Sequence, residues 1–344
     1  MAGVSIKRAY LAVNGLHIKS QVSRGVIAVS RADNEISQND IDRVIQAASV
    51  VSLPANREMI HVIPRNFIVD GVENVKNPLG MKGVRLEAEV FIIEGLSPYL
   101  RNLAKCVNEN NIEVAGLVFA PLASSLSVLD KSQKEYGVLN IDFGGGTSAL
   151  TIFEEADLLH SAVLPIGSKH ITSDLAVALR TSMDVAERVK LEHGTTSEGL
   201  DLRKRENIDI SGLVGENNFL WPKKQLVGVI DARVHELLDL VSAELKRISK
   251  AIFPGGVVLS GGGAKLPGLA ALVKERLRLP VMISRPVNVR VGPEGQNDPA
   301  FSVAIGLILW GVEEEFGVAR GNAAPVSKNV FFKRVKGWLK NFLP

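Results

Sequence analysis

Short apolar runs alternate with segments of helical periodicity along most of this chain. The runs that begin at Val138 and Val257 are almost continuously apolar, as in buried β-strands, and each leads into a group of glycines. The segment from about residue 227 to residue 252 has apolar residues at positions 230, 234, 237, 238, 241 and 245, which is helical spacing. The pattern therefore predicts buried strands that end in glycine turns, with one long amphipathic helix between them.

The first hundred residues carry turn and cap signals between further predicted strands. Asn14-Gly15 separates two short predicted strands, which indicates a β-hairpin. Ser37 to Asp40 resembles a capping box, with Asp in place of the usual Glu or Gln, and predicts a helix over about residues 41–51. Residues 59–71 are predicted to form a strand that Pro64 interrupts.

The stretch VLNIDFGGGTSAL, residues 138–150, is the first candidate for chemistry. It predicts two strands joined by a turn at Gly144, Gly145, Gly146 and Thr147. Successive backbone N–H groups in such a turn suit a phosphate. Asp142, at the end of the first strand, could hold a magnesium ion through water. The alternative is a glycine-rich hairpin that binds nothing.

Two further motifs extend this candidate. VVLSGGGAKLPGL, residues 257–269, predicts a strand, the three glycines Gly261, Gly262 and Gly263, and then a helix. Neither the dinucleotide fingerprint GxGxxG nor the P-loop GxxxxGK[ST] fits this spacing. Between the two glycine stretches, DVAERVKLEH predicts a helix with Glu187 and Lys190 one turn apart. Taken alone, that pair reads as a solvated ion pair.

In this order, the three motifs resemble the ATP site of the actin, Hsp70 and sugar-kinase superfamily. The resemblance extends to the FtsA family of bacterial cell-division proteins and covers nearly the whole chain. It is carried by FAPLASSLSVL (119–129), VLPIGSKHITSDLAVAL (163–179), AERVKLEHG (186–194), VVLSGGGAKLPGL (257–269) and FSVAIGLILWG (301–311). It implies an α/β, actin-like fold whose two ribonuclease-H-like halves face a nucleotide cleft, with ATP and Mg²⁺ as cofactors.

The resemblance also implies roles and subdomains. Gly144–Thr147 would bind phosphates, Asp142 hydrated magnesium, Glu187 and Lys190 the ribose and base, and Gly261–Gly263 the adenosine. The implied subdomains are a small FtsA-type subdomain (1–86), an incomplete first core domain (87–134 and 300–316), a second core domain (135–185 and 253–299), an inserted subdomain (186–252), a linker (317–329) and a terminal helix (330–344).

One part of the superfamily pattern is not found in this sequence. No stretch before Arg31 provides the first phosphate hairpin, with its own Asp and a Gly-Thr or Gly-Ser turn. We therefore expect either a fragment or internal start, or a divergent form with half of the phosphate clamp. Such a form would have reduced ATP affinity and at most weak ATPase activity.

Composition narrows the class of protein. With 46% hydrophobic and 22% charged residues, the chain is typical of globular proteins, and 344 residues suffice for two domains. A single cysteine, Cys106, excludes an internal disulfide and fits a reducing compartment. The most apolar run, Val303–Val312, is too short to cross a bilayer, so we expect a cytoplasmic protein. The basic charge gathers at the C-terminus, which argues against nucleic-acid binding by the body.

The last fifteen residues predict an amphipathic helix behind a Gly- and Pro-bearing linker. One face is apolar and the other is entirely basic, as in helices that lie in a membrane interface. The apolar residues are Phe331, Phe332, Val335, Trp338, Leu339, Phe342 and Leu343, and the basic ones are Lys333, Arg334, Lys336 and Lys340. The alternative is a helix that docks on the protein's own core.

Together with these features, the family resemblance implies a non-enzymatic adaptor at the cytoplasmic face of the membrane, at the division site. Similarity to FtsA implies that it tethers FtsZ filaments through the FtsZ C-terminal tail, recruits other divisome proteins, self-assembles into an actin-like filament and binds anionic lipids. Two alternatives stay open: a sugar-kinase-type enzyme, for which no substrate base besides Asp142 is found, and an actin-like pilus-assembly scaffold.

Overall fold

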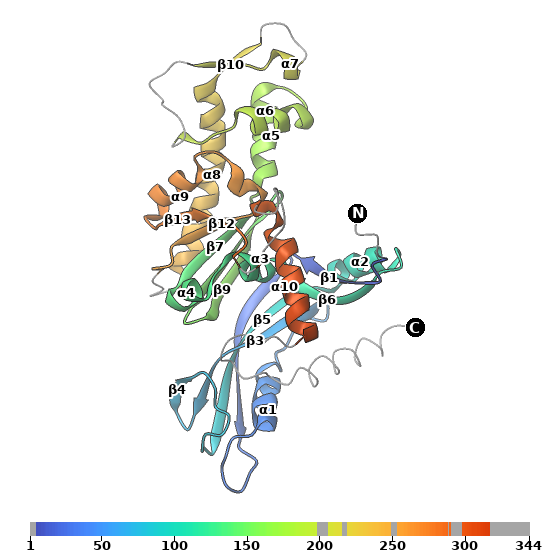
Figure 1. Ribbon diagram of the computed structural model, residues 1–344, viewed down its shortest axis with the longest axis vertical. Coiled ribbons are helices and arrows are strands. Elements are labelled where there is room, and N and C mark those ends of the chain that lie inside the picture. The colour runs from blue at the N-terminus through green and yellow to red at the C-terminus, as the bar shows by residue number, and fades with distance from the viewer. Residues whose placement is uncertain are drawn as a thin grey trace. The chain divides into compact units, whose positions relative to one another are not determined.

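The computed structural model describes residues 5–197, 206–214, 219–248, 253–287, 289 and 298–316. These residues form two compact units, which Figure 1 shows as ribbons. Unit 1 takes in the described residues of Met1–Lys19 and Tyr99–Trp310, and unit 2 those of Ser20–Pro98 and Gly311–Pro344. The predicted linker and terminal helix lie outside the described residues. The predicted subdomain boundaries stay a prediction.

A five-stranded sheet lies at the centre of unit 1, in the order β13-β12-β7-β8-β9. Its middle strand β7 runs parallel to β12 and antiparallel to β8, and β8 is antiparallel to β9. All six residues of β7 are buried, including the polar residues Asn140 and Asp142. The strands are β7 (Val138–Phe143), β8 (Ser148–Glu154), β9 (Asp157–Leu164), β12 (Val257–Ser260) and β13 (Val281–Ile283).

Helices cover this sheet and bury its apolar residues in one core. The predicted long helix is confirmed as α8 (Lys223–Lys246), which packs against α5 (Ser168–Leu179), α9 (Leu269–Leu277) and strand β9 (Figure 1). Its inward face is the predicted one, because positions 230, 234, 237, 238 and 241 are all buried.

The predicted hairpin about Asn14-Gly15 is wrong. Strand β1 (Arg8–Val13) pairs in parallel with β6 (Glu113–Phe119), whereas β2 (Lys19–Ala28) belongs to another sheet. A type I′ hairpin turn needs positive φ at both central residues. Here Gly15 has a φ of +135°, but the φ of Asn14 is not positive. The Asn14 side chain instead accepts a hydrogen bond from the Gly15 N–H at 2.9 Å.

Helix α3 (Ala120–Val128) follows β6 and is buried almost throughout. On one side, hydroxyl and amide groups join it to the five-stranded sheet, through Ser124, Ser125, Asn140, Thr151 and Ser260. On the other side it packs against α10 (Ser302–Phe316), where Ser127 Oγ donates to the Ser302 carbonyl at 2.7 Å. Thus α3 is fixed between the sheet and α10.

The remaining elements of the described chain are short or peripheral. They are α2 (Ser97–Asn108), α4 (Lys131–Tyr136), α6 (Met183–His193), β10 (Asn207–Asp209), α7 (Ser211–Val214), β11 (Leu220–Pro222), η2 (Gly262–Lys265) and η3 (Pro299–Phe301). Among the described residues, none of the helices combines the length and the apolar character needed to cross a membrane.

Unit 2 is a four-stranded sheet of order β2-β5-β3-β4 with helix α1 (Gln38–Ala48) packed on it. Its long strands are β3 (Arg57–Val69) and β5 (Arg85–Leu96), and β4 is Val72–Val75. The prediction that Pro64 interrupts the strand is wrong. Strand β3 continues through Pro64, because the register against β5 shifts between Pro64 and Asn66, and such a bulge tolerates proline.

The predicted capping box is confirmed at the start of α1. Asp40 is fully buried, and its carboxylate accepts hydrogen bonds from the backbone and hydroxyl groups of Ser30 and Ser37 and from the Arg43 guanidinium. Burial alone would raise the pKa of Asp40, but these hydrogen bonds outweigh it and lower the pKa to about 2. The ionised carboxylate therefore stabilises unit 2.

We expect Asp40→Asn to lower the free energy of unfolding by about 2 kcal/mol at pH 7. Since the pKa is lower in the folded state, this contribution is complete above the unfolded value near 3.8 and is lost as the pH falls towards 2. Urea unfolding of both proteins between pH 7 and pH 2.5 measures the difference.

The control is Asp42→Asn on the same helix, where the carboxylate accepts a bond from Gln38. This variant should stay within about 0.5 kcal/mol of the wild type. A difference between wild type and Asp40→Asn that did not change with pH would contradict the assignment.

Candidate functional site

The β7–β8 hairpin places a buried carboxylate beside a glycine turn. Asp142 is the penultimate residue of β7 and is only 9% exposed. The turn that follows is closed by a hydrogen bond from the Gly144 N–H to the Thr147 carbonyl at 3.1 Å. The predicted order of strand, carboxylate and glycine turn is therefore present in the structure.

The second glycine turn lies directly beside the first. Strand β12 is parallel to β7, and the pairing sets Ser260 opposite Asp142. Gly261 follows at φ +80°, so close that a Cβ there would stand 2.3 Å from Asp142 Oδ1 and 2.6 Å from the Phe143 carbonyl oxygen. Because the two strands are parallel neighbours, both turns open at the same end of the sheet.

Helix α5 begins against the first turn. The backbone N–H groups of Ser168 and Lys169 donate to the carbonyls of Gly144 and Gly145, at 2.9 and 2.8 Å. These two N–H groups belong to the first turn of the helix and have no partner inside it. The contact therefore fixes the glycine turn to the start of α5.

The predicted Glu187–Lys190 pair is formed and connects to α5. Lys190 Nζ donates to Glu187 Oε2 at 2.7 Å, to Thr172 Oγ1 at 2.9 Å and to the Ser168 carbonyl at 3.3 Å. Thr172 also hydrogen-bonds to Glu187. All three ammonium protons of the buried Lys190 thus have protein acceptors, whereas the Glu187 side chain stays 40% exposed. In this arrangement Lys190 orients Glu187.

The two carboxylates of the site differ in their electrostatics. Burial raises the pKa of Asp142 to about 6, and a hydrogen bond from Ser124 offsets part of that effect. Burial also acts to raise the pKa of Glu187, but the hydrogen bonds from Lys190 and Thr172 and the charges of Lys190 and Lys169 lower it. Asp142 therefore holds a poorly compensated negative charge, and Glu187 a well compensated one.

An isolated buried carboxylate fits a hydrated magnesium ion. Within the part of the chain that the structure describes, no group of three or more His, Cys, Asp and Glu residues is arranged to hold a metal. Magnesium does not need such a cage, because it keeps several waters and binds through one or two carboxylates and the phosphates of a nucleotide. The poorly compensated charge of Asp142 would supply the one carboxylate.

The structure thus brings all the sequence-predicted nucleotide residues to one region of unit 1. Sequence reasoning missed three of their neighbours: Thr172, Ser124 and Asn14. Asn14 Nδ2 lies 3.4 Å from Thr147 Oγ1, across 133 residues of sequence. The Asn-Gly pair was visible as a turn, but its position next to the glycine hairpin follows only from the pairing of β1 with β6.

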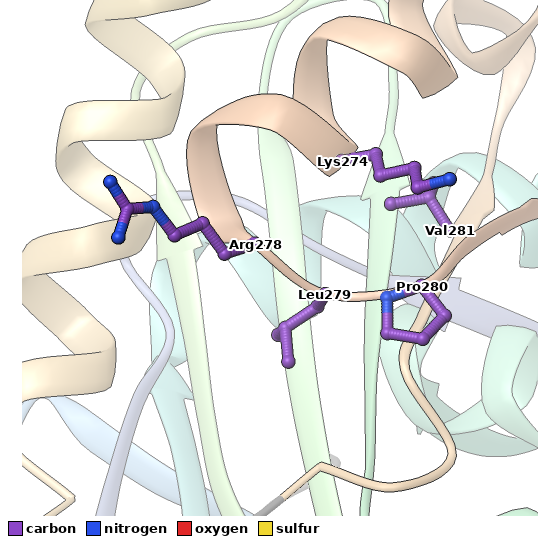
Figure 2. A pocket seen from close by; sticks show the side chains of 5 residues that line it. All are labelled: Lys274, Arg278, Leu279, Pro280 and Val281. Carbon is purple, nitrogen blue, oxygen red and sulfur yellow. The ribbon is translucent and has the colours of Figure 1, made fainter.

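A separate hollow lies at the end of α9. It is lined by Lys274, Arg278, Leu279, Pro280 and Val281. Figure 2 shows the Lys274 and Arg278 side chains extending in opposite directions, so their charges do not converge on one point. We assign no ligand to it.

Comparisons with known proteins point to one family. The family model "Cell division protein FtsA" matches residues 139–306, and the model "SHS2 domain inserted in FTSA" matches residues 15–94. The cell division protein FtsA of Borreliella burgdorferi is 36% identical over 341 residues, which is 98% of this chain and 83% of the relative. FtsA of Bacillus subtilis is 37% identical over 311 residues, covering 90% and 69%.

Among solved structures, a PilM–PilN type IV pilus biogenesis complex is similar, with a TM-score of 0.58 and 20% sequence identity. The match covers 89% of this chain and 80% of that chain. At this identity it shows the fold alone, which is the predicted actin-like α/β fold. Both family models and relatives more than 35% identical over at least 90% of its length establish that this chain belongs to the FtsA family of cell-division proteins.

Proposed function

We propose that this protein is an ATP-binding adaptor of the division machinery, which tethers FtsZ filaments to the cytoplasmic face of the membrane. Membership of the FtsA family supports the role in division. The observation that carries the nucleotide part is the meeting of Asp142, two glycine turns and the Glu187–Lys190 pair in one region.

In this proposal each group has a distinct task. The turn Gly144–Thr147 binds the phosphates through backbone N–H groups. Asp142 orients the waters of a magnesium ion, which would neutralise phosphate charge. Glu187, held by Lys190 and Thr172, accepts hydrogen bonds from the ribose hydroxyls. Gly261–Gly263 let the adenosine lie close to the backbone. Binding regulates self-assembly, with at most weak ATPase activity and no further enzymatic reaction.

The membrane and partner parts of the proposal rest on the sequence and the family. The terminal residues 330–344 combine an apolar face with a basic one, which suits an anionic leaflet. A single helix of this kind binds reversibly, so several copies in one filament bind far more tightly than one copy. The FtsZ C-terminal tail and other divisome proteins are the proposed partners.

Co-sedimentation with phosphatidylglycerol-containing liposomes, with and without FtsZ filaments, tests the adaptor function. The intact chain should bring FtsZ down with the liposomes, and a chain that ends at Asn329 should not. Neutral phosphatidylcholine liposomes serve as the control for the basic face, and should retain much less of the intact protein.

Two other results would redirect the assignment. If the intact chain binds lipid but leaves FtsZ in solution, the partner is wrong and the actin-like pilus scaffold becomes the better candidate. If the chain that ends at Asn329 binds lipid as well as the intact chain does, the terminal residues are not the anchor.

A further inference from the structure

Lys169 lies along the glycine turn that is proposed to bind phosphates. It is the second residue of α5, and its backbone N–H donates to the Gly145 carbonyl at 2.8 Å. Its side-chain carbons Cε, Cγ and Cδ stand 3.6, 3.8 and 3.9 Å from the place that a Cβ of Gly145 would take. The aliphatic stem therefore lies against the turn, and the residue is exposed to solvent.

The ammonium group of Lys169 is not paired with another group among the described residues. Its ammonium has no hydrogen bond or ion pair with any residue that the structure describes, in contrast to Lys190, which has three acceptors, and Lys265, which pairs with Asp298. Its charge does act on Glu187, after burial and the closer contacts of Lys190 and Thr172. Lys169 is thus a free cation within electrostatic range of the site.

A nucleotide at this turn would bring several negative charges, and Asp142 adds another. Backbone N–H groups supply only partial positive charge. A lysine on a flexible stem is a common phosphate ligand because it acts as a mobile point charge. We propose that Lys169 contacts the phosphates of the nucleotide bound at Gly144–Thr147 and so favours nucleoside di- and triphosphates over monophosphates. This inference rests on the proposed nucleotide-binding function.

The competing explanation is that the Lys169 ammonium is solvated and does not touch the ligand. In that case only the backbone N–H, which any residue at position 169 keeps, and the aliphatic stem act on the turn. The number of phosphates on the ligand separates the two. A phosphate contact grows with that number, whereas a purely structural effect of the stem changes the affinity for every nucleotide equally.

The experiment measures binding of AMP, ADP and ATP, each with magnesium, to the full chain by titration calorimetry. Lys169→Ala should weaken ADP and ATP binding by about tenfold and leave AMP unchanged, and its ATP affinity should depend less on salt. Lys169→Arg should retain most of the affinity. Lys131→Ala, at an exposed lysine of α4, is the matched control and should bind as the wild type does.

Three results would overturn the inference. Wild-type affinity for ADP and ATP in Lys169→Ala would show that the ammonium makes no contact. Equal losses for AMP, ADP and ATP would show that only the stem matters. If the wild type itself bound none of the three nucleotides, the proposed nucleotide function would fail and this inference with it.

Discussion

Replacing Gly261 by alanine is expected to weaken ATP binding by about ten- to a hundredfold, equivalent to about 1–3 kcal/mol. The new Cβ would stand 2.3 Å from Asp142 Oδ1 and 2.6 Å from the Phe143 carbonyl oxygen, and the backbone there has φ +80°. The oxygen of Phe143 is backbone, so the clash is relieved only by moving the end of β7, which carries Asp142. Titration calorimetry with magnesium and ATP measures the loss.

A glycine outside the site provides the control. Gly212 is exposed on helix α7, and no atom lies within 4 Å of a Cβ added there. Gly212→Ala should therefore bind ATP within about threefold of the wild type. Equal affinities for the two variants would contradict the close packing of the two glycine turns, and loss of binding in both would point to general unfolding, which circular dichroism detects.

The second large effect is expected in the packing of α10 against α3. Gly306 approaches α3 so closely that a Cβ would lie 1.8 Å from the carbonyl oxygen of Ala123. This atom is helix backbone, and α3 is itself fixed by hydroxyl groups on its opposite side. Gly306→Ala must therefore separate the two helices, and we expect it to lower the free energy of unfolding by about 3 kcal/mol or more.

Gly228 is the matched control, because it is an exposed glycine inside helix α8 with no atom within 4 Å of an added Cβ. Gly228→Ala should stabilise the protein by up to about 1 kcal/mol, since alanine is the better helix former. Thermal unfolding of both variants measures whether each substitution lowers or raises the stability of the protein. A Gly306→Ala variant as stable as the wild type would exclude the close helix contact.

Features that depend on neighbours in sequence could be predicted. The long helix α8, the capping box at Asp40 and the Glu187–Lys190 pair each follow from spacings of three or four residues. Features that depend on distant partners could not. Asn14-Gly15 has the local signal of a hairpin, but β1 finds its partner in β6, about a hundred residues later. Pro64 continues a strand because the bulge that follows it in β3 shifts the register against β5.

The same distinction holds at the site. Its glycines and Asp142 could be identified from the sequence, because consecutive glycines cost conformational entropy and indicate a special backbone conformation. The family resemblance gave these residues roles. The sequence contains no sign that Thr172 holds Glu187 and Lys190 together, because Thr172 comes from another helix. Lys169 lies within the family-like run of residues 163–179, yet its position over Gly145 becomes visible only from the structure, where hydrogen bonds join α5 to the turn.

The pairing of β7 with β12 has a consequence for synthesis on the ribosome. Ser260 hydrogen-bonds to Asn140, which precedes it by 120 residues. At a translation rate of about 5–20 residues per second, β7 and β8 emerge roughly 6–24 s before β12. During that interval one edge of the apolar strand β7 has no strand beside it, which is the situation that favours aggregation or chaperone binding. The nascent chain therefore needs protection at the same edge that later completes the nucleotide site.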